Sequence, residues 1–168
     1  VRADHMGMLA TTINSLALAD TFEQKGIPCC VLTAVEMQSF ADPYSARRAR
    51  AELEAGKVVI LGGGSGLPFF STDTAGVLRA AEIGADMVLL AKNIDGIYTA
   101  DPRLDPTATR YDEITYDEVL EKKLRALDMS ATLFCMENNL RCYAFALQDP
   151  QNIYRVVMGE RVGTEMHI

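Results

Sequence analysis

Apolar and polar residues alternate in blocks along this chain, in a pattern typical of strands and helices that follow one another. Short runs rich in valine, leucine, isoleucine or cysteine predict strands over 29–33, 58–61, 87–91 and 142–147. Longer segments with apolar residues three or four positions apart predict helices over 4–25, 45–55, 72–83, 116–124 and 128–138. A last edge strand is expected over 163–168. This alternation favours an α/β fold with a mainly parallel sheet.

The first predicted helix has two apolar faces at helical spacing. One comprises Met6, Leu9, Ile13 and Leu16, and the other comprises Met8, Leu18 and Phe22. A surface helix needs only one apolar face. Two faces therefore predict burial by the domain on the first side and, at the second face with Phe22, by a neighbouring subunit. A central core helix would give the same pattern. In the helix over 128–138, the expected inner face comprises Met129, Leu133, Met136 and Leu140.

Composition narrows the class of protein. The 168 residues are expected to form one domain, 1–168, because 49% of them are hydrophobic and can supply a core. The net charge of −7 argues against a nucleic-acid partner or an anionic membrane surface. No apolar run approaches the roughly 18 residues of a membrane span. The four cysteines lack a Cys-x-x-Cys spacing, which disfavours structural zinc; Cys29 and Cys30 are expected as buried thiols in a cytoplasmic protein.

Two loops follow predicted strands and carry the residues best suited to hold phosphorylated ligands. The first loop, 62–73, is rich in glycine and runs into a helix for which Thr72 is the expected N-cap. A glycine-rich turn before a helix exposes backbone N–H groups to an anion. The second loop, 95–102, carries acidic residues that can hold Mg²⁺ or a ribose. The sequence therefore predicts a nucleotide site at the carboxyl ends of the strands.

Four motifs in order carry a family resemblance: Asp4–Thr11, Pro68–Asp73, Asp95–Pro102 and Arg155–Glu160. With them the chain resembles the bacterial UMP kinases of the amino-acid-kinase superfamily, from its first residue to nearly its last. Members of that family begin with a Lys-Leu-Ser-Gly-type loop and a second glycine-rich loop, and neither precedes Asp4 here. The resemblance implies the C-terminal two-thirds of a three-layer αβα sandwich, with the N-terminal part missing. Since the missing loops grip the transferring phosphate, the 168 residues alone are expected to be inactive.

The resemblance also implies an activity and a site. The activity is ATP-dependent phosphorylation of UMP to UDP in pyrimidine nucleotide biosynthesis, with Mg²⁺, by a cytoplasmic homohexamer. Catalytic roles are implied for Asp73 and Asp128, with Asp73 also near Mg²⁺. UMP binding is implied for Asp4, Ser65, Gly66, Leu67, Pro68, Phe69, Phe70, Ser71 and Thr72. ATP binding is implied for Lys92, Asn93, Tyr98 and Asp101, and the choice between Lys92 and Asn93 stays open.

Each candidate has a plainer interpretation. The glycine loop could be only a tight turn with two core phenylalanines, and Asp73 could serve only the helix dipole. Asp4 could be a helix N-cap, and Asp95 a turn residue as readily as a site residue. Many relatives carry Asn where Leu67 stands, so one side-chain hydrogen bond to the nucleotide is expected to be missing. The whole chain could instead be a non-catalytic nucleotide-binding or subunit-interaction module. A Rossmann oxidoreductase is a weaker alternative, because Leu67 occupies the place of that motif's last glycine.

Overall fold

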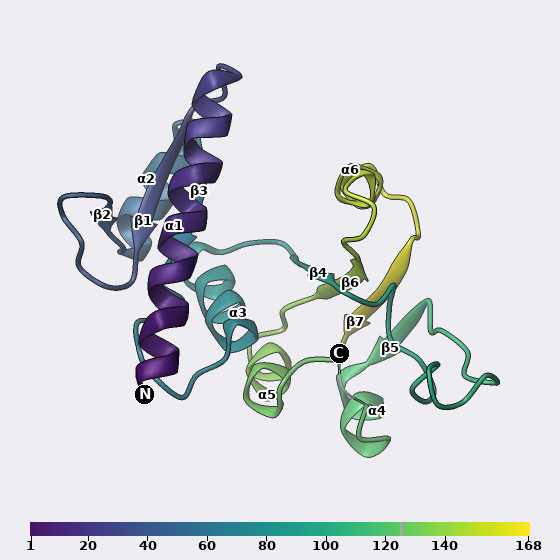
Figure 1. The fold of residues 1–168 in the computed structure, drawn as a ribbon. Helices are drawn as coiled ribbons and strands as arrows, with labels where there is room; N and C mark the ends of the chain where they lie inside the picture. Colours follow the sequence, from purple (N-terminus) through teal and green to yellow (C-terminus); the bar gives the residue numbers. More distant parts are fainter. Residues whose placement is uncertain (125) are drawn as a thin grey trace. The chain divides into compact units, whose positions relative to one another are not determined.

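A computed structural model of the protein describes residues 1–124 and 126–168. These residues fall into two compact units, Val1–Ile83 and Gly84–Ile168 (Figure 1). In each unit helices accompany a sheet whose strands are mainly parallel. The predicted α/β class and mainly parallel pairing are therefore confirmed. The expectation of a single domain over 1–168 stays a prediction.

The first unit contains three strands and three helices. In chain order they are α1 (Arg2–Gln24), β1 (Cys29–Thr33), β2 (Asp42–Pro43), α2 (Ala46–Glu54), β3 (Val58–Gly62) and α3 (Thr72–Ile83). The sheet has the order β2-β1-β3 and is parallel throughout, with Cys29 opposite Val58 and Thr33 opposite Gly62. The strands and helices predicted for this half of the sequence are confirmed, and only the two-residue β2 was not expected.

Helix α1 packs on β1 and β3 through a face made mostly of small residues. Its buried residues are Met8, Thr12, Ser15 and Ala19. The approach is close, because a Cβ on Gly62 of β3 would lie 3.0 Å from Ser15 Oγ. Small side chains on the helix and a glycine on the strand therefore bring the two backbones together.

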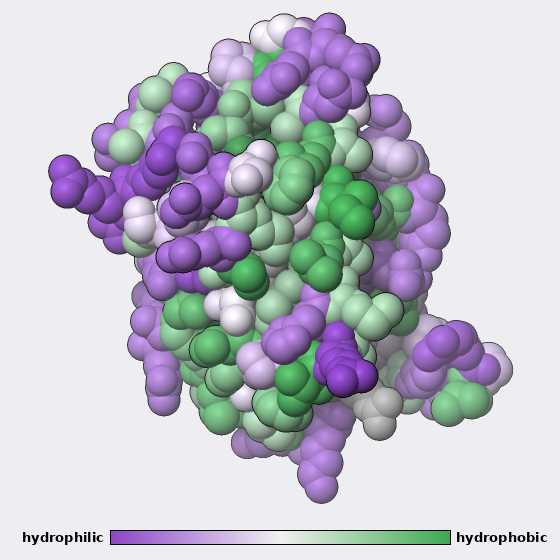
Figure 2. Space-filling model, turned by 60° about the vertical axis from the view of Figure 1, so that its left-hand side comes forward, coloured by the Kyte–Doolittle hydropathy of each residue, from purple (hydrophilic) through white to green (hydrophobic). Residues whose placement is uncertain are grey.

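The outer face of α1 is apolar and exposed. Met6 and Ile13 are 70% and 67% exposed, and Leu9 and Leu16 also reach solvent. Figure 2 shows that exposed hydrophobic side chains gather together on the face that it displays. The two-faced pattern is thus real, but the free face is the one of Met6, Leu9, Ile13 and Leu16. On the face that was expected to be free, Met8 is buried and Phe22 is half-buried, whereas Leu18 is 45% exposed.

The described residues of the second unit form four strands and three helices. They are β4 (Val88–Lys92), β5 (Glu113–Thr115), α4 (Tyr116–Glu121), α5 (Met129–Glu137), β6 (Cys142–Ala146), α6 (Gln151–Val157) and β7 (Gly163–His167). The sheet order is β4-β6-β7-β5, in which only the β6–β7 pair is antiparallel. The strand predicted over 163–168 is confirmed as β7, but its expected position at an edge was wrong, because β7 lies between β6 and β5. Strand β5 and helix α6 were not predicted.

Helix α5 also turns a face of small residues inward. Ala131, Thr132 and Cys135 are buried, whereas Met129 is 65% exposed and Leu133 is also exposed. The expected inner face was therefore wrong at those two positions. The buried Cys135 Sγ lies 3.6 Å from Cys142 Sγ on β6. This hydrogen-bonded contact and burial raise the pKa of Cys135, so this thiol stays protonated near neutral pH.

Two further expectations concern the burial of Cys29 and Cys30 and the lack of a membrane-spanning segment. Cys29 and Cys30 are half-buried rather than buried, and all four cysteines are free thiols. Burial raises the pKa of Cys30, which keeps this thiol protonated near neutral pH. Among the described residues, no helix has both the length and the apolar character needed to cross a bilayer.

Candidate functional site

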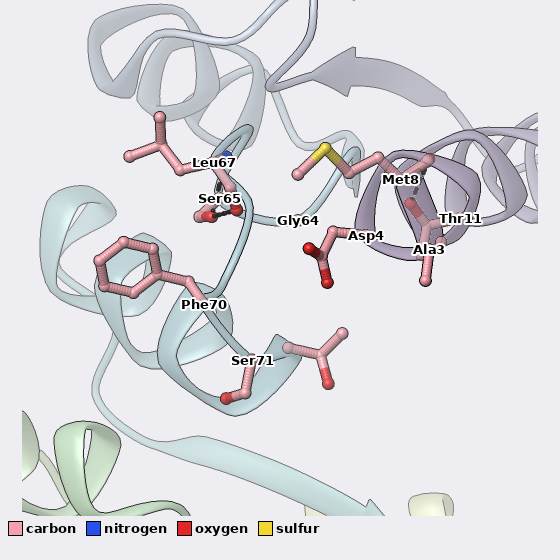
Figure 3. Close-up of a pocket in the computed structure, with 11 residues that line it drawn as sticks. Ala3, Asp4, Met8, Thr11, Gly64, Ser65, Leu67, Phe70 and Ser71 are labelled. Atoms are coloured by element: carbon pink, nitrogen blue, oxygen red, sulfur yellow. Dashed lines mark hydrogen bonds between the residues drawn. The ribbon is translucent and has the colours of Figure 1, made fainter. Parts of the chain in front are cut away.

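A cavity of about 270 Å³ lies between α1 and the glycine-rich loop of the first unit (Figure 3). From α1 it is lined by Ala3, Asp4, Gly7, Met8 and Thr11, and from the loop by Gly64, Ser65, Leu67, Phe70, Ser71 and Thr72. Two motifs that lie about sixty residues apart in the sequence thus form the two walls of one cavity. Its volume is close to the lower end of the range of roughly 300–1,000 Å³ for small-molecule sites.

Glycines shape the loop wall for two physical reasons. Gly63 and Gly66 both have φ of +80°, a left-handed conformation that other residues rarely adopt. Both also run close to the segment after β1, since a Cβ on Gly66 would lie 3.0 Å from the carbonyl oxygen of Ala34. Side chains at these positions would be strained and crowded at once. The glycines are therefore required by the fold of the loop, whatever ligand it holds.

A hydroxyl on α1 fixes the start of this loop. The N–H of Gly63 donates to Thr11 Oγ1 at 2.9 Å, and the Thr11 hydroxyl donates to the carbonyl of Met8 at 2.7 Å. Further along, the hydroxyl of Ser65 accepts from the N–H of Leu67 and donates to its carbonyl, both at 3.1 Å (Figure 3). The loop thus has its own local network and is tied to α1 through Thr11.

The cavity ends at the N-terminus of α3. Ser71 Oγ accepts the N–H of Thr74 at 3.1 Å, so Ser71 and not Thr72 caps the helix. Ser71 and Thr72 line the cavity at the start of this helix of 12 residues. The aligned peptide dipoles and free N–H groups of a helix N-terminus favour an anion there. Asp73 lies in the first turn and is half-buried, and it is not one of the residues that line the cavity.

Asp4 faces the cavity from α1. Its carboxylate points from the helix into the gap beside the loop (Figure 3), and its Oδ2 lies 3.1 Å from the N-terminal amine of Val1. The alternative of Asp4 as helix N-cap is wrong, because α1 starts at Arg2 and the cap position is Val1. The carboxylate is therefore placed to meet a ligand in the cavity.

The two phenylalanines of the loop lie at the surface. Phe69 is 82% exposed and Phe70 is 54% exposed, so the interpretation of them as core residues is wrong. Phe70 and the 58%-exposed Leu67 line the cavity. The expected UMP residues Gly66, Pro68 and Phe69 do not line it. Phe69 has φ of +71°, which is strained for a bulky residue.

In the second unit, Asp95 organises the loop that follows β4. The Tyr98 hydroxyl donates to Asp95 Oδ1 at 2.8 Å, and Arg110 donates to Asp95 Oδ2 at 3.2 Å. The hydrogen bond to Asp95 raises the pKa of Tyr98, and burial adds to the shift. Asp95 thus has a structural role that orients Tyr98. Tyr98 is the expected ATP-binding aromatic residue.

The same loop is anchored to the sheet by Thr164 of β7, which is fully buried. Its hydroxyl accepts the N–H of Ile97 at 2.9 Å and donates to the carbonyl of Tyr111 at 2.5 Å. Gly96 is required here, since a Cβ on it would lie 2.5 Å from Thr164 Oγ1. Sequence reasoning missed Thr11, Arg110 and Thr164. Each is distant in sequence from the loop segment that it fixes.

The other candidates of the second unit each take part in local structure. Asp101 pairs with Arg103 at 3.0 Å, and the carbonyl of Asn93 accepts from Gln148 at 2.6 Å. Lys92 is the last residue of β4 and is half-buried. Asp128 is the N-cap of α5, accepting the N–H of Ala131 at 3.0 Å. These contacts are compatible with ligand binding, and the proposed site roles stay predictions.

The side chains in the described part of the chain form no group of three or more histidines, cysteines or carboxylates able to hold a metal ion. Mg²⁺ rarely needs such a cage. It keeps several waters and is bound through one or two carboxylates together with substrate phosphates. A half-buried carboxylate at the start of α3, beside the cavity, fits that manner of binding.

The family model of the amino acid kinase family matches residues 1–145 of this chain. The chain belongs to the amino acid kinase family. Among solved structures, it is similar to UMP kinase from Bacillus anthracis, with 36% identity and a TM-score of 0.95. It is similar to UMP kinase from Ureaplasma parvum, with 34% identity and a TM-score of 0.95. Uridylate kinase from Archaeoglobus fulgidus is more distant, with 29% identity and a TM-score of 0.71.

The matches span nearly all of this chain but only part of each solved structure. The first two structures match 99% of this chain, and the third matches 97% of it. It covers 69% of the Bacillus protein and 71% of each of the other two. The shared fold therefore includes both units of this chain.

Proposed function

We propose that this chain carries the acceptor site and part of the ATP site of an ATP-dependent UMP kinase, which makes UDP in pyrimidine nucleotide biosynthesis. The observation that carries the proposal is the cavity of the first unit. Its walls come from the segments 3–11 and 64–72, and both motifs expected to bind UMP contribute lining residues. The similarity to proteins named UMP kinase and uridylate kinase supports the same activity.

In the proposed acceptor site, the ribose, phosphate and pyrimidine of UMP contact a carboxylate, a helix N-terminus and apolar side chains, respectively. Asp4 accepts hydrogen bonds from the ribose hydroxyls, because its carboxylate faces the cavity. Ser71 and Thr72 meet an anionic oxygen at the N-terminus of α3. Leu67 and Phe70 supply an apolar surface beside the pyrimidine. Ser65 and Gly66 shape the loop, and Pro68 and Phe69 complete its outer edge.

In the proposed ATP site, Tyr98 packs against the adenosine end with its ring oriented by Asp95 and Arg110. Asp101 contacts the same end, and Lys92 or Asn93 contributes from the end of β4. These residues all belong to the second unit. Their assignment to ATP is supported by the resemblance of the Asp95–Pro102 motif.

The proposed reaction transfers the γ-phosphoryl group of ATP to UMP. An oxygen of the UMP phosphate attacks the γ-phosphorus in line, and the bond to the bridging oxygen of ADP breaks. No general base is required, since a phosphate monoester is already ionised near neutral pH. Asp73 and Asp128 are the proposed catalytic carboxylates. Mg²⁺ would neutralise charge on the transferring phosphate, and Asp73 is the residue proposed to hold it.

The proposed assembly and compartment follow from surface features. The exposed apolar face of α1 is suited to pair with another subunit, and we propose a homohexamer, as the resemblance implies. The cytoplasm is the proposed compartment, which four free cysteines suit.

Nucleotide titration calorimetry tests the proposal. We expect UMP to bind more tightly than CMP or dTMP, and Asp4→Asn to weaken UMP binding by about tenfold through loss of a charged acceptor. Equal affinity for CMP would indicate a broader nucleoside-monophosphate site. A well-folded protein that binds no nucleotide monophosphate would contradict the proposal.

The alternative is a nucleotide-binding or subunit-interaction module without catalysis. One observation favours keeping it: within the described residues, no lysine or arginine lines the cavity. Positive charge for the transferring phosphate must then come from elsewhere. A coupled assay of UMP-dependent ADP release decides between the two when the chain is tested together with the N-terminal part that the resemblance implies, because the module would bind UMP and still release no ADP. Inactivity of the 168 residues alone stays a prediction.

A further inference from the structure

We infer that Thr11 is a positioning residue that sets the spacing between the two walls of the acceptor cavity. Its hydroxyl is the tie between α1 and the glycine loop, accepting the N–H of Gly63 at 2.9 Å. The Thr11 hydroxyl donates its proton to the carbonyl of Met8 at 2.7 Å, so the oxygen acts as the acceptor toward the loop. Thr11 also lines the cavity.

The contact is well placed to control the loop. Gly63 comes directly after β3, so its orientation determines the path of Gly64, Ser65 and Leu67, which form the far wall. On its other side, Gly63 approaches the segment after β1, where a Cβ would lie 3.2 Å from the N–H nitrogen of Ala34. The start of the loop is thus held between two elements. Losing the Thr11 oxygen would leave a part-buried N–H without an acceptor and free the loop to move away from α1.

Thr12 provides a matched control one residue away. Its hydroxyl donates to the same carbonyl of Met8 at 3.1 Å, and the side chain is buried. In the part of the chain that the structure describes, Thr12 neither lines the cavity nor bonds to the glycine loop. Thr11→Val and Thr12→Val remove the same hydroxyl bond within α1 and keep the side-chain shape. They differ in whether the acceptor of the Gly63 N–H is lost.

The inference rests on the proposed function for its ligand, so the experiment has one readout with UMP and one without. By titration calorimetry, we expect Thr11→Val to raise the Kd for UMP by about tenfold. Thr11→Ser and Thr12→Val should stay within about threefold of the original protein, and the Kd for a non-hydrolysable ATP analogue should not change. By hydrogen exchange, the Gly63 amide should lose protection in Thr11→Val and keep it in Thr11→Ser and Thr12→Val.

The outcomes separate the two proposals. Unchanged UMP affinity in Thr11→Val, with Thr12→Val as the baseline, would overturn the role of Thr11 while leaving UMP binding intact. Absence of UMP binding in the original protein, together with loss of Gly63 protection in Thr11→Val, would overturn the proposed function and leave the tie to the loop standing. If Thr11→Val does not fold, Thr11→Ala takes its place. An unprotected Gly63 amide in the original protein would refute the inference without any variant.

Discussion

The strained backbone at Phe69 predicts that glycine is more stabilising than alanine at this position, the reverse of the usual order. Phe69 follows Pro68 at the tip of the loop and has φ of +71°. In this region a residue with a Cβ loses about 1–2 kcal/mol. Glycine avoids that loss but costs about 0.5–1 kcal/mol in unfolded-chain entropy. Because the side chain is 82% exposed, replacing it removes little buried surface.

The comparison of Phe69→Gly with Phe69→Ala isolates the strain, because both lose the ring and only alanine keeps the Cβ. We expect the glycine variant to be more stable than the alanine variant by roughly 0.5–1 kcal/mol. For a chain of this length, that corresponds to a Tm higher by about 1–3 °C. At an ordinary position the order is reversed, since glycine is the less stable of the two.

Thermal and urea denaturation of the two variants measure this difference. Equal m-values would show that the variants unfold from comparable native states. A Phe69→Ala variant as stable as Phe69→Gly, or more stable, would refute the reasoning. Both variants should bind UMP more weakly than the original protein if the ring contacts the nucleotide. Unchanged affinity in both would limit the proposed role of Phe69 to loop shape.

Three further predictions concern charge and assembly. In a preparation that turns over UMP, Asp73→Asn should lower kcat by about 10²-fold, because a preorganised charge at the reacting phosphate is lost. The Tm should not change. A near-normal kcat would limit the role of Asp73 to its interaction with the helix dipole. Ile13→Glu places a charge on the exposed face of α1 and should dissociate the assembly, as measured by light scattering. Phe22→Glu should instead mainly destabilise the fold, because Phe22 is half-buried. An Ile13→Glu protein with an unchanged assembly mass would exclude that face as the interface. Burial, together with a hydrogen bond to Glu82, raises the pKa of Tyr44 from 10.0 to about 12, so its contribution to stability is complete below about pH 10 and is lost as pH rises towards 12. Urea denaturation of Tyr44→Phe should show a smaller decline over that interval, and an identical decline in both proteins would contradict the shift.

Much of the fold followed from local patterns. The strands over 29–33 and 58–61 and the helices around them were predicted to within a few residues, because apolar runs and glycine stops are local signals. Strand β5 has only three residues and shows no period. Helix α6 begins after Pro150 without a side-chain cap, so it lacks the usual start signal.

The errors in burial have a common physical origin. Hydropathy predicts large apolar residues inside, yet α1 and α5 turn alanine, serine, threonine and cysteine inward. Which face of a two-faced helix is buried depends on how closely the partner strand approaches, and that is a tertiary property. Likewise, the motifs predicted which segments form the cavity. They did not predict the Thr11 tie, which joins residues 52 positions apart.

Because α1 packs on the sheet through small side chains, enlarging substitutions at this contact should be more damaging than shortening ones. In most cores the damaging substitutions are those that remove atoms and leave a cavity. Where Ser15 meets Gly62, little remains to remove, and any added methylene group must push the helix off the sheet at about 1–3 kcal/mol. Natural variation along this contact should therefore be confined to the smallest side chains, while the outer face of α1 is free to change with whatever it binds.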